Sequence, residues 1–299
     1  MADRSPDEYK HNGYDDRPSP AQLASGTVEV RVAKPAPTTG SRRAKRTRPT
    51  SSPPTVSLVI PVRNEARTIA CFLEQIADEV SEIILVDGNS TDATLITACS
   101  ARPDIKVISQ EGVGKGSALR TGFLAASSDV IVVMDADGSM APQEIRHYLH
   151  FLTNGYDFVK GSRFIVGGGS LDSTHSGRLG NRFVLTVFNT LYDTNLTDLT
   201  YGFCAFHRRY LDLLSLRATG LEIEAEMAVR AVQVGLRVVE VPSLEMSRRS
   251  GKSNLHAIRN GIRVLRTVVR SHHSEVLGPV MPPPPKSTGA QQLARTSPR

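Results

Sequence analysis

The segment from Val130 to Gly138 constrains the fold more than any other part of the chain. It reads Val-Ile-Val-Val-Met-Asp-Ala-Asp-Gly, an apolar, largely β-branched run that stops on two carboxylates one residue apart. Such a run predicts a buried parallel strand, and open α/β sheets bind ligands just beyond the carboxyl ends of their strands. In an extended chain Asp135 and Asp137 share one face, which suits a hard cation that also holds a diphosphate. The alternative is a strand that ends in an ordinary Asp-Gly turn.

Strands and helices alternate around this segment. Apolar runs predict strands at Val56 to Val62, Glu82 to Val86, Ile105 to Ser109, from Val130, and at Phe158 to Gly161. Helices are predicted at Glu65 to Val80, at Asp92 to Ala101 with a cap from Ser90 or Thr91, at Ser117 to Ala126, from Pro142, and at Glu222 to Val234. The alternation indicates an α/β fold with a mostly parallel sheet.

The two ends of the chain differ from the middle. Residues 1–54 lack apolar periodicity and contain the basic run Ser41 to Arg48, so we predict a disordered basic tail. Residues 55–247 form the predicted central domain, residues 248–277 a loop and a basic helix, and residues 278–299, rich in Pro, Ser and Gln, a second disordered tail.

Charge and apolar content limit the classes of partner. The net charge of +6 favours anionic partners such as phosphorylated ligands, nucleic acid or an acidic membrane surface. No stretch approaches the roughly 18 apolar residues of a membrane span, and the N-terminus lacks the apolar segment of a signal peptide. We therefore predict a cytoplasmic protein, with Cys71, Cys99 and Cys204 as buried thiols.

Two further motifs follow predicted strands. Asp87 ends the second strand, where a carboxylate either binds a nucleotide's base or ribose or acts as a turn residue. The glycine-rich stretch from Glu111 to Ser117 offers Lys115 to a phosphate. It does not have the spacing of a P-loop or of a dinucleotide fingerprint, which disfavours an ATPase and a nicotinamide enzyme.

Together these motifs resemble family 2 glycosyltransferases with the GT-A fold, and within them the dolichyl- and polyprenyl-phosphate mannosyl- or glucosyltransferases. The matching residues run from about Val56 to Ser271 and comprise Ile60 to Glu65, Val86 to Asp92, Gly112 to Gly116 with Ala118 and Gly122, Met134 to Asp137, Gly161 to Phe164 with Gly167 to Gly169, Asp198 to Phe203, Glu226, and Arg248 to Ser253. Four positions depart from the family pattern: Arg63, Ser139, Cys204 and Asn254.

The resemblance implies a role for each of these motifs. The nucleotide-sugar donor would be held by Pro61, Glu65, Asp87, Lys115 and Asp135. Mg²⁺ or Mn²⁺ would be bound by Asp135 and Asp137, with Ser139 at a position where relatives often have a Gln ligand. The domain of residues 55–247 would be catalytic, and residues 248–277 would face the acceptor.

The acceptor determines what further catalysis is needed. A lipid monophosphate is already anionic and needs cations, for which Arg163 and Arg248 are the best candidates, although each could instead form a structural ion pair. A hydroxyl acceptor needs a general base, for which Glu226 is the candidate; otherwise Glu226 is structural.

The leading interpretation is inverting transfer of a hexose from GDP-mannose or UDP-glucose to a polyprenyl or dolichyl phosphate. The alternatives are transfer to a soluble hydroxyl acceptor and a non-catalytic nucleotide-sugar-binding protein. A nucleic-acid binder is disfavoured because the basic segments lack interleaved aromatic residues for base stacking.

The basic helix near the C-terminus leaves two interpretations open. Its apolar residues recur at steps of three and four, namely Leu255, Ile258, Ile262, Leu265 and Val269, among arginines that include Arg259, Arg263, Arg266 and Arg270. This face either packs against the catalytic domain or lies on an anionic membrane, which would make the protein peripheral on the cytoplasmic face.

Overall fold

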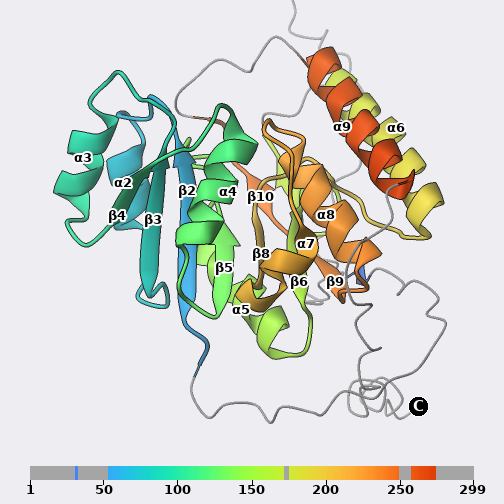
Figure 1. Ribbon diagram of the computed structural model, residues 1–299, viewed down its shortest axis with the longest axis horizontal. Coiled ribbons are helices and arrows are strands. Elements are labelled where there is room, and N and C mark those ends of the chain that lie inside the picture. The colour runs from blue at the N-terminus through green and yellow to red at the C-terminus, as the bar shows by residue number, and fades with distance from the viewer. Residues whose placement is uncertain (1–30, 33–52, 172–174, 249–256, 274–299) are drawn as a thin grey trace, which may run out of the picture.

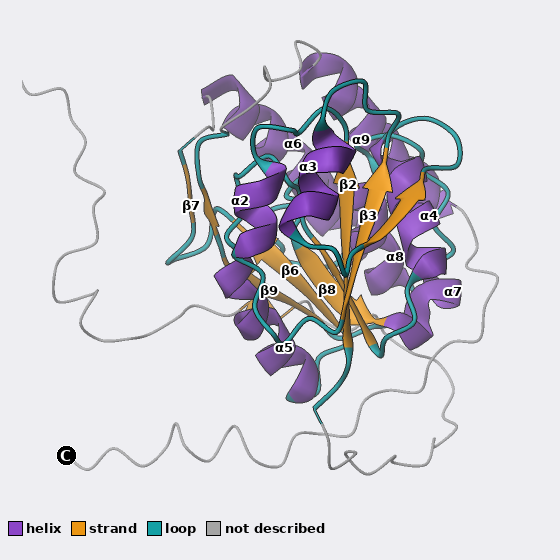
Figure 2. Cartoon of the chain, turned by 90° about the vertical axis from the view of Figure 1, so that its left-hand side faces the viewer, coloured by secondary structure: helices purple, strands orange, loops and turns teal. Residues whose placement is uncertain are grey.

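The computed structural model describes residues 31–32, 53–171, 175–248 and 257–273. A twisted central sheet separates two layers of helices (Figure 1). Helices α2, α3 and α5 cover one face of the sheet, and α4, α7 and α8 cover the other (Figure 2). The predicted α/β fold with a mostly parallel sheet is confirmed, and its layers are helix, sheet and helix.

The main sheet has eight strands in the order β1-β9-β6-β8-β5-β2-β3-β4. Their bounds are β1 Arg31–Val32, β2 Val56–Val62, β3 Glu82–Asp87, β4 Lys106–Ser109, β5 Val130–Val133, β6 Phe158–Ser162, β8 Cys204–His207 and β9 Val238–Pro242. Strands β2 to β5 pair in parallel, as do β6 and β9, whereas β8 is antiparallel to both of its neighbours. A separate parallel pair is formed by β7 Gly169–Ser170 and β10 Leu244–Glu245.

The helices are α2 Ile69–Glu74, α3 Thr94–Ala101, α4 Lys115–Ala125, α5 Ile145–Thr153, α6 His175–Tyr192, α7 Leu211–Leu214, α8 Ile223–Gln233 and α9 Ala257–His273. The helix predicted to open at Pro142 begins with the 3-10 turn Pro142–Glu144 and continues as α5. A second 3-10 turn, Arg208–Tyr210, precedes α7.

Successive side chains of a strand point to opposite faces of the sheet, and both faces of this sheet carry buried apolar residues. In β2, Val59 belongs to the core under α4, α6, α8 and α9, while Leu58 and Ile60 belong to the core under α2, α3 and α5. Strand β5 is buried at all four positions. Burial on both faces explains why these strands are continuous apolar runs in the sequence.

Helix α4 lies unusually close to the sheet at Gly122. A Cβ atom there would lie 2.4 Å from Cγ1 of Val59 and 2.9 Å from Cγ2 of Val86. The contact requires glycine, since real Cβ atoms do not approach other atoms so closely. This accounts physically for one residue of the motif that the sequence shares with the glycosyltransferases.

Two predicted helices differ from the structure. The helix predicted from Glu65 to Val80 is limited to Ile69–Glu74, and that predicted from Asp92 begins at Thr94. The predicted caps Ser90 and Thr91 are wrong: Oδ1 of Asp92 instead accepts a hydrogen bond from the Thr94 amide, at 3.0 Å. The hydroxyl of Ser90 and the amide of Thr91 bond to Asn64 in the neighbouring loop.

Within the predicted disordered tail of residues 1–54, the described residues include the strand β1, so the prediction of disorder is wrong there. Arg31–Val32 pairs antiparallel with β9 at the edge of the sheet. The remaining residues up to 52, and the tail predicted at 278–299, lie outside the described residues.

Two expectations from composition are also tested. Cys204 is buried, but Cys71 and Cys99 are exposed on the outer sides of α2 and α3, so the prediction of three buried thiols is wrong. Among the described residues, no helix is both long and apolar enough to cross a membrane.

The basic helix α9 packs on the core mainly through Val264 and Val268, which the predicted apolar face did not include. Val264 and Val268 are buried in the core under α6 and α8, and Leu265 is partly buried. Ile262 and Val269 of the predicted apolar face are exposed. Of the two interpretations left open by the sequence, packing against the domain therefore holds for Leu265 but not for Ile262 and Val269, and Leu255 lies outside the described part of the chain.

Candidate active site

The carboxylates predicted to bind a metal follow β5, next to the point where the sheet order reverses between β2 and β5. Asp135 and Asp137 are both partly exposed, and Ser139 is buried behind them. The Ser139 amide donates a hydrogen bond to Oδ1 of Asp137 at 3.0 Å, which fixes the turn. This is the position at which open α/β sheets bind ligands.

Lys115 joins this site from the first turn of α4. Its Nζ lies 2.7 Å from Asp135 and 2.6 Å from Oε1 of Glu224, on α8. Burial lowers the pKa of Lys115, but the attraction of the two carboxylates outweighs it and holds the pKa well above its usual value. Burial raises the pKa of Glu224 despite the opposing charge of Lys115. Sequence reasoning missed Glu224.

Arg248 reaches the site from the chain that follows β10. Its Nε lies 3.3 Å from Oδ2 of Asp137. The segment before it is held against the turn that follows Asp137, because the Met246 amide donates a hydrogen bond to the Ser139 carbonyl at 2.9 Å. Each of the two aspartates is therefore next to a basic side chain: Lys115 for Asp135 and Arg248 for Asp137.

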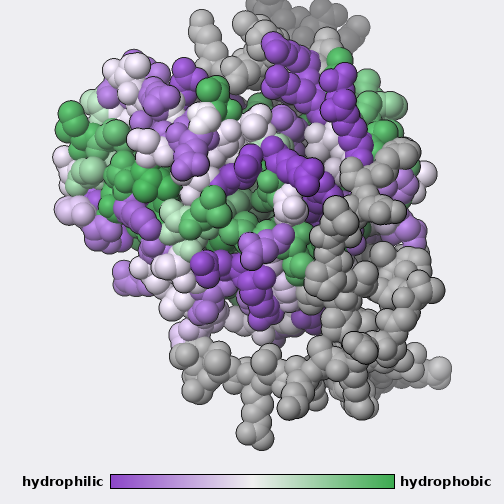
Figure 3. Space-filling view, in the orientation of Figure 1, coloured by the Kyte–Doolittle hydropathy of each residue, from purple (hydrophilic) through white to green (hydrophobic). Residues whose placement is uncertain are grey.

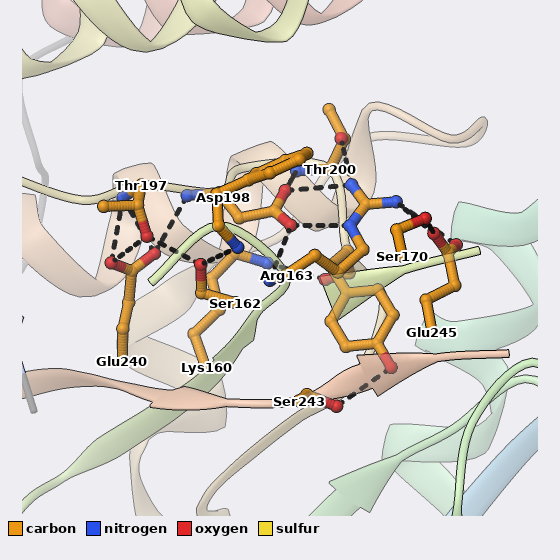
Figure 4. A network of polar contacts seen from close by, with 12 residues as sticks. Lys160, Ser162, Arg163, Ser170, Thr197, Asp198, Thr200, Glu240, Ser243 and Glu245 are labelled. Atoms are coloured by element: carbon orange, nitrogen blue, oxygen red, sulfur yellow. Dashed lines mark hydrogen bonds and ion pairs between the residues drawn. The ribbon is translucent and has the colours of Figure 1, made fainter. Parts of the chain in front are cut away.

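Arg163 is enclosed in a network of acidic side chains (Figure 4). Its Nε lies 2.7 Å from Asp198, and its Nη1 lies 3.1 Å from Glu245. Nη2 donates to Asp198 at 3.0 Å and to the Thr200 hydroxyl at 3.1 Å. Although burial lowers it, the pKa of Arg163 is held far above its usual value by Asp198 and Glu245. The geometry corresponds to the ion-pair alternative, which joins β6, β10 and the loop before β8.

Glu240 extends this network on β9. Its carboxylate accepts hydrogen bonds from the Thr197 amide and hydroxyl, both at 2.8 Å, and from the Asp198 amide at 3.0 Å. Burial nevertheless raises the pKa of Glu240 to about 7. The network thus fixes the backbone that presents Asp198 to Arg163.

Glu226, also on α8, is buried and contacts the loop that precedes this helix. Its carboxylate accepts hydrogen bonds from the amides of Arg217, at 3.0 Å, and Ala218, at 2.8 Å. That loop in turn packs on the glycine-rich motif, where the Ser117 amide donates to the Thr219 carbonyl at 3.1 Å. The geometry gives Glu226 a structural role in positioning the loop.

The predicted donor residues at the ends of β2 and β3 lie side by side. Pro61 pairs with Val86 and Val62 with Asp87 in the sheet register. Asp87 accepts a hydrogen bond from the Ser90 amide at 3.1 Å, and Glu65 accepts one from the Thr68 hydroxyl at 3.1 Å. Both carboxylates thus form local turn contacts at the edge where a nucleoside is expected; their role in donor binding remains a prediction.

Asp135 and Asp137 are suited to a divalent cation whose remaining ligands are waters or substrate phosphates. Within the described ranges, no group of three or more His, Cys, Asp or Glu side chains is arranged to hold a metal ion. Mg²⁺ is, however, commonly bound by one or two carboxylates, with substrate phosphates and waters completing its shell. Asp135 and Asp137 would supply these two carboxylates. A bound metal would replace Lys115 as the partner of Asp135 and Arg248 as the partner of Asp137.

Comparison with known proteins identifies the family. Residues 57–214 match the family described as glycosyl transferase family 2, which is more than half of the chain. The chain belongs to this family. As a family 2 glycosyltransferase it is 33% identical over 214 residues to glycosyltransferase AglJ of Haloferax volcanii, covering 70% of this chain and 69% of the relative. It is also 30% identical over 212 residues to an undecaprenyl-phosphate mannosyltransferase of Micrococcus luteus, covering 67% of this chain and 87% of the relative.

Solved structures confirm the GT-A fold predicted for this family 2 glycosyltransferase. The glucosyl-3-phosphoglycerate synthase of Mycobacterium tuberculosis, crystallised with Mn²⁺, UDP and glucosyl-3-phosphoglycerate, superposes with a TM-score of 0.60. The match covers 73% of this chain and 80% of that chain at 24% identity, and at this identity it shows the fold and not the substrate.

Proposed function

We propose that this glycosyltransferase moves a hexose from GDP-mannose or UDP-glucose to a polyprenyl phosphate, with inversion at the anomeric carbon. The observation that carries the proposal is the position of Arg248, whose Nε lies 3.3 Å from Asp137. A guanidinium beside the proposed metal carboxylates suits an anionic acceptor that must approach an anionic donor. The polyprenyl-phosphate mannosyltransferase among the relatives supports the same acceptor class.

The donor binds along the ends of β2, β3 and β5 in this proposal. Pro61, Glu65 and Asp87 line the nucleoside side, and Lys115 at the first turn of α4 lies on the diphosphate side. Asp135 and Asp137 hold Mg²⁺ or Mn²⁺, with the buried Ser139 fixing the turn between them and β10. The bound ion supplies neutralisation of the departing nucleoside diphosphate.

The acceptor phosphate needs no protein base. Its second pKa is about 6, so it is largely dianionic at neutral pH. One of its oxygens attacks the anomeric carbon, and the bond from that carbon to the nucleoside diphosphate breaks. Arg248 aligns the attacking phosphate. Arg163 acts indirectly, because its ion pairs with Asp198 and Glu245 fix the backbone of the segments that carry these two acidic residues.

Transfer assays with the purified protein test this function. We expect labelled hexose from GDP-mannose or UDP-glucose to enter undecaprenyl phosphate in Mn²⁺ or Mg²⁺, and the product to disappear with EDTA. The anomeric configuration of the product, measured by NMR, should be opposite to that of the donor. Transfer to soluble hydroxyl acceptors with no lipid product would contradict the proposal, as would donor binding without any turnover.

The surface near α9 suggests how the protein reaches a lipid. Strongly hydrophilic residues lie over α9, with hydrophobic residues next to them (Figure 3). The exposed residues of α9 include Ile262 and Val269 together with Arg259, Arg263, Arg266 and Arg270. The adjacent α6 exposes Leu179 and Phe183. Apolar side chains among arginines are suited to the interface of an anionic membrane, where each basic residue adds about 1 kcal/mol.

Vesicle sedimentation tests this membrane contact. We expect the protein to bind anionic vesicles in a salt-sensitive manner, and binding to weaken when Arg259, Arg263, Arg266 and Arg270 are all changed to Gln. A matched variant loses the same charge at exposed arginines elsewhere, namely Arg67, Arg120, Arg146 and Arg209. This control should sediment more than the α9 variant. Equal recovery in the supernatant with anionic and neutral lipid would rule out the membrane contact and favour a soluble acceptor.

A further inference from the structure

Lys115 lies between two carboxylates, of which the proposed function uses only one. Its ammonium group contacts Asp135 at 2.7 Å and Glu224 at 2.6 Å, and all three side chains are largely shielded from solvent. Gly202 covers the cluster: a Cβ atom there would lie 2.9 Å from Nζ of Lys115 and 3.0 Å from Oε1 of Glu224. The backbone therefore closes directly over the charges.

A metal that binds Asp135 takes that carboxylate away from Lys115. A shielded cation that loses its only partner is costly, because neither water nor another charge replaces the lost contact. Glu224 removes this problem, since it keeps a carboxylate on Lys115 after Asp135 has turned to the metal. The cluster also has one more negative than positive charge, which favours the approach of a divalent cation.

We infer that Glu224 is a positioning residue that releases Asp135 for the metal by retaining Lys115. The inference rests on the proposed assignment of Asp135 as a metal ligand. Glu226 cannot take over this task, although it lies on the same helix, because side chains two residues apart point to different faces and its carboxylate is bound to the amides of Arg217 and Ala218.

Binding of Mn²⁺ to the full-length protein, without nucleotide sugar, tests the inference. Electron paramagnetic resonance measures the unbound ion directly, so that no enzymatic turnover is needed. In Glu224→Gln, Lys115 has Asp135 as its remaining carboxylate partner in the cluster, and Mn²⁺ must compete with it. We expect the dissociation constant to rise by about tenfold or more.

A double variant separates charge balance from a structural defect. Lys115→Gln combined with Glu224→Gln removes the competing cation and leaves the net charge of the cluster unchanged. Its Mn²⁺ affinity should therefore recover to at least that of the wild type. A role of Glu224 in packing alone predicts that the double variant binds no better than the single one.

Controls distinguish failure of this inference from failure of the metal site. Glu226→Gln, a buried glutamate of the same helix, should keep the Mn²⁺ dissociation constant within about twofold of the wild type. Unchanged affinity in Glu224→Gln, or no recovery in the double variant, would overturn the role of Glu224. If the wild type binds no Mn²⁺, or Asp135→Asn binds it equally well, the proposed metal site itself is wrong.

Discussion

Asp137→Asn is expected to abolish sugar transfer while the protein remains folded. The substitution removes one of the two carboxylates proposed to bind the metal and creates no cavity, because Asn has the same shape. Its side-chain oxygen can still accept the hydrogen bond from the Ser139 amide, which is 3.0 Å from Oδ1 in the native chain. The measurement is turnover in saturating Mn²⁺ or Mg²⁺, with thermal unfolding to verify the fold.

A matched substitution shows whether this loss is specific. Asp104 is exposed and paired with Arg102, outside the candidate site. Asp104→Asn should therefore leave transfer unchanged. Near-normal turnover of Asp137→Asn in excess metal would show that Asp137 is not a ligand.

Arg248→Ala is expected to reduce transfer to a polyprenyl phosphate by roughly two or more orders of magnitude. The guanidinium is proposed to align the attacking phosphate, and alanine supplies neither charge nor hydrogen bonds. Glu226→Gln should reduce the same reaction much less, since its carboxylate contacts the amides of Arg217 and Ala218 and no proposed substrate atom. With a hydroxyl acceptor that needs a general base, the ranking of the two variants should reverse.

Kinetics of both variants on one acceptor decide between the two chemistries. Arg146→Ala provides the control, because Arg146 is an exposed arginine that pairs with Glu79, at 2.6 Å, on the surface of α5. It should retain wild-type turnover. Full activity in both Arg248→Ala and Glu226→Gln would show that the assignment of the acceptor side is wrong.

The parts of the fold that were predictable have local signals. Strand β2 has the predicted bounds Val56–Val62 because its apolar run is continuous and buried on both faces. The helix predicted from Glu65 is limited to Ile69–Glu74, and the turn that precedes it is bound to residues distant in the sequence. The Glu65 amide donates to the Thr94 hydroxyl at 2.8 Å and the Ala66 amide to Asp92 at 3.2 Å, contacts that no local window of sequence contains.

The candidate site likewise contains residues with a local sequence signal and residues that only tertiary contacts bring together. Asp135 and Asp137 were found because they end an apolar run, which marks the edge of a sheet. Glu224 lies 109 positions from Lys115 in the chain, and no local pattern in the sequence marks it as a partner of that lysine. Family resemblance drew attention to Glu226, whereas the three-dimensional structure places Glu224 and Asp135 on the same lysine, Lys115. The pairing of Arg163 with Asp198 and Glu245 likewise depends on tertiary contacts.

The close contact of Gly122 with Val59 and Val86 affects the site from a distance. Gly122 and Lys115 lie on the same helix, seven residues and about 10 Å apart, so the depth at which α4 rests on the sheet sets the height of the Lys115 ammonium group. A side chain at position 122 would clash with Val59 and Val86, and we expect a displacement of α4 that relieves the clash to move Lys115 as well. A glycine in a motif that is associated with substrate binding therefore controls the spacing between two layers of the protein, and through it the alignment of charges at the sheet edge.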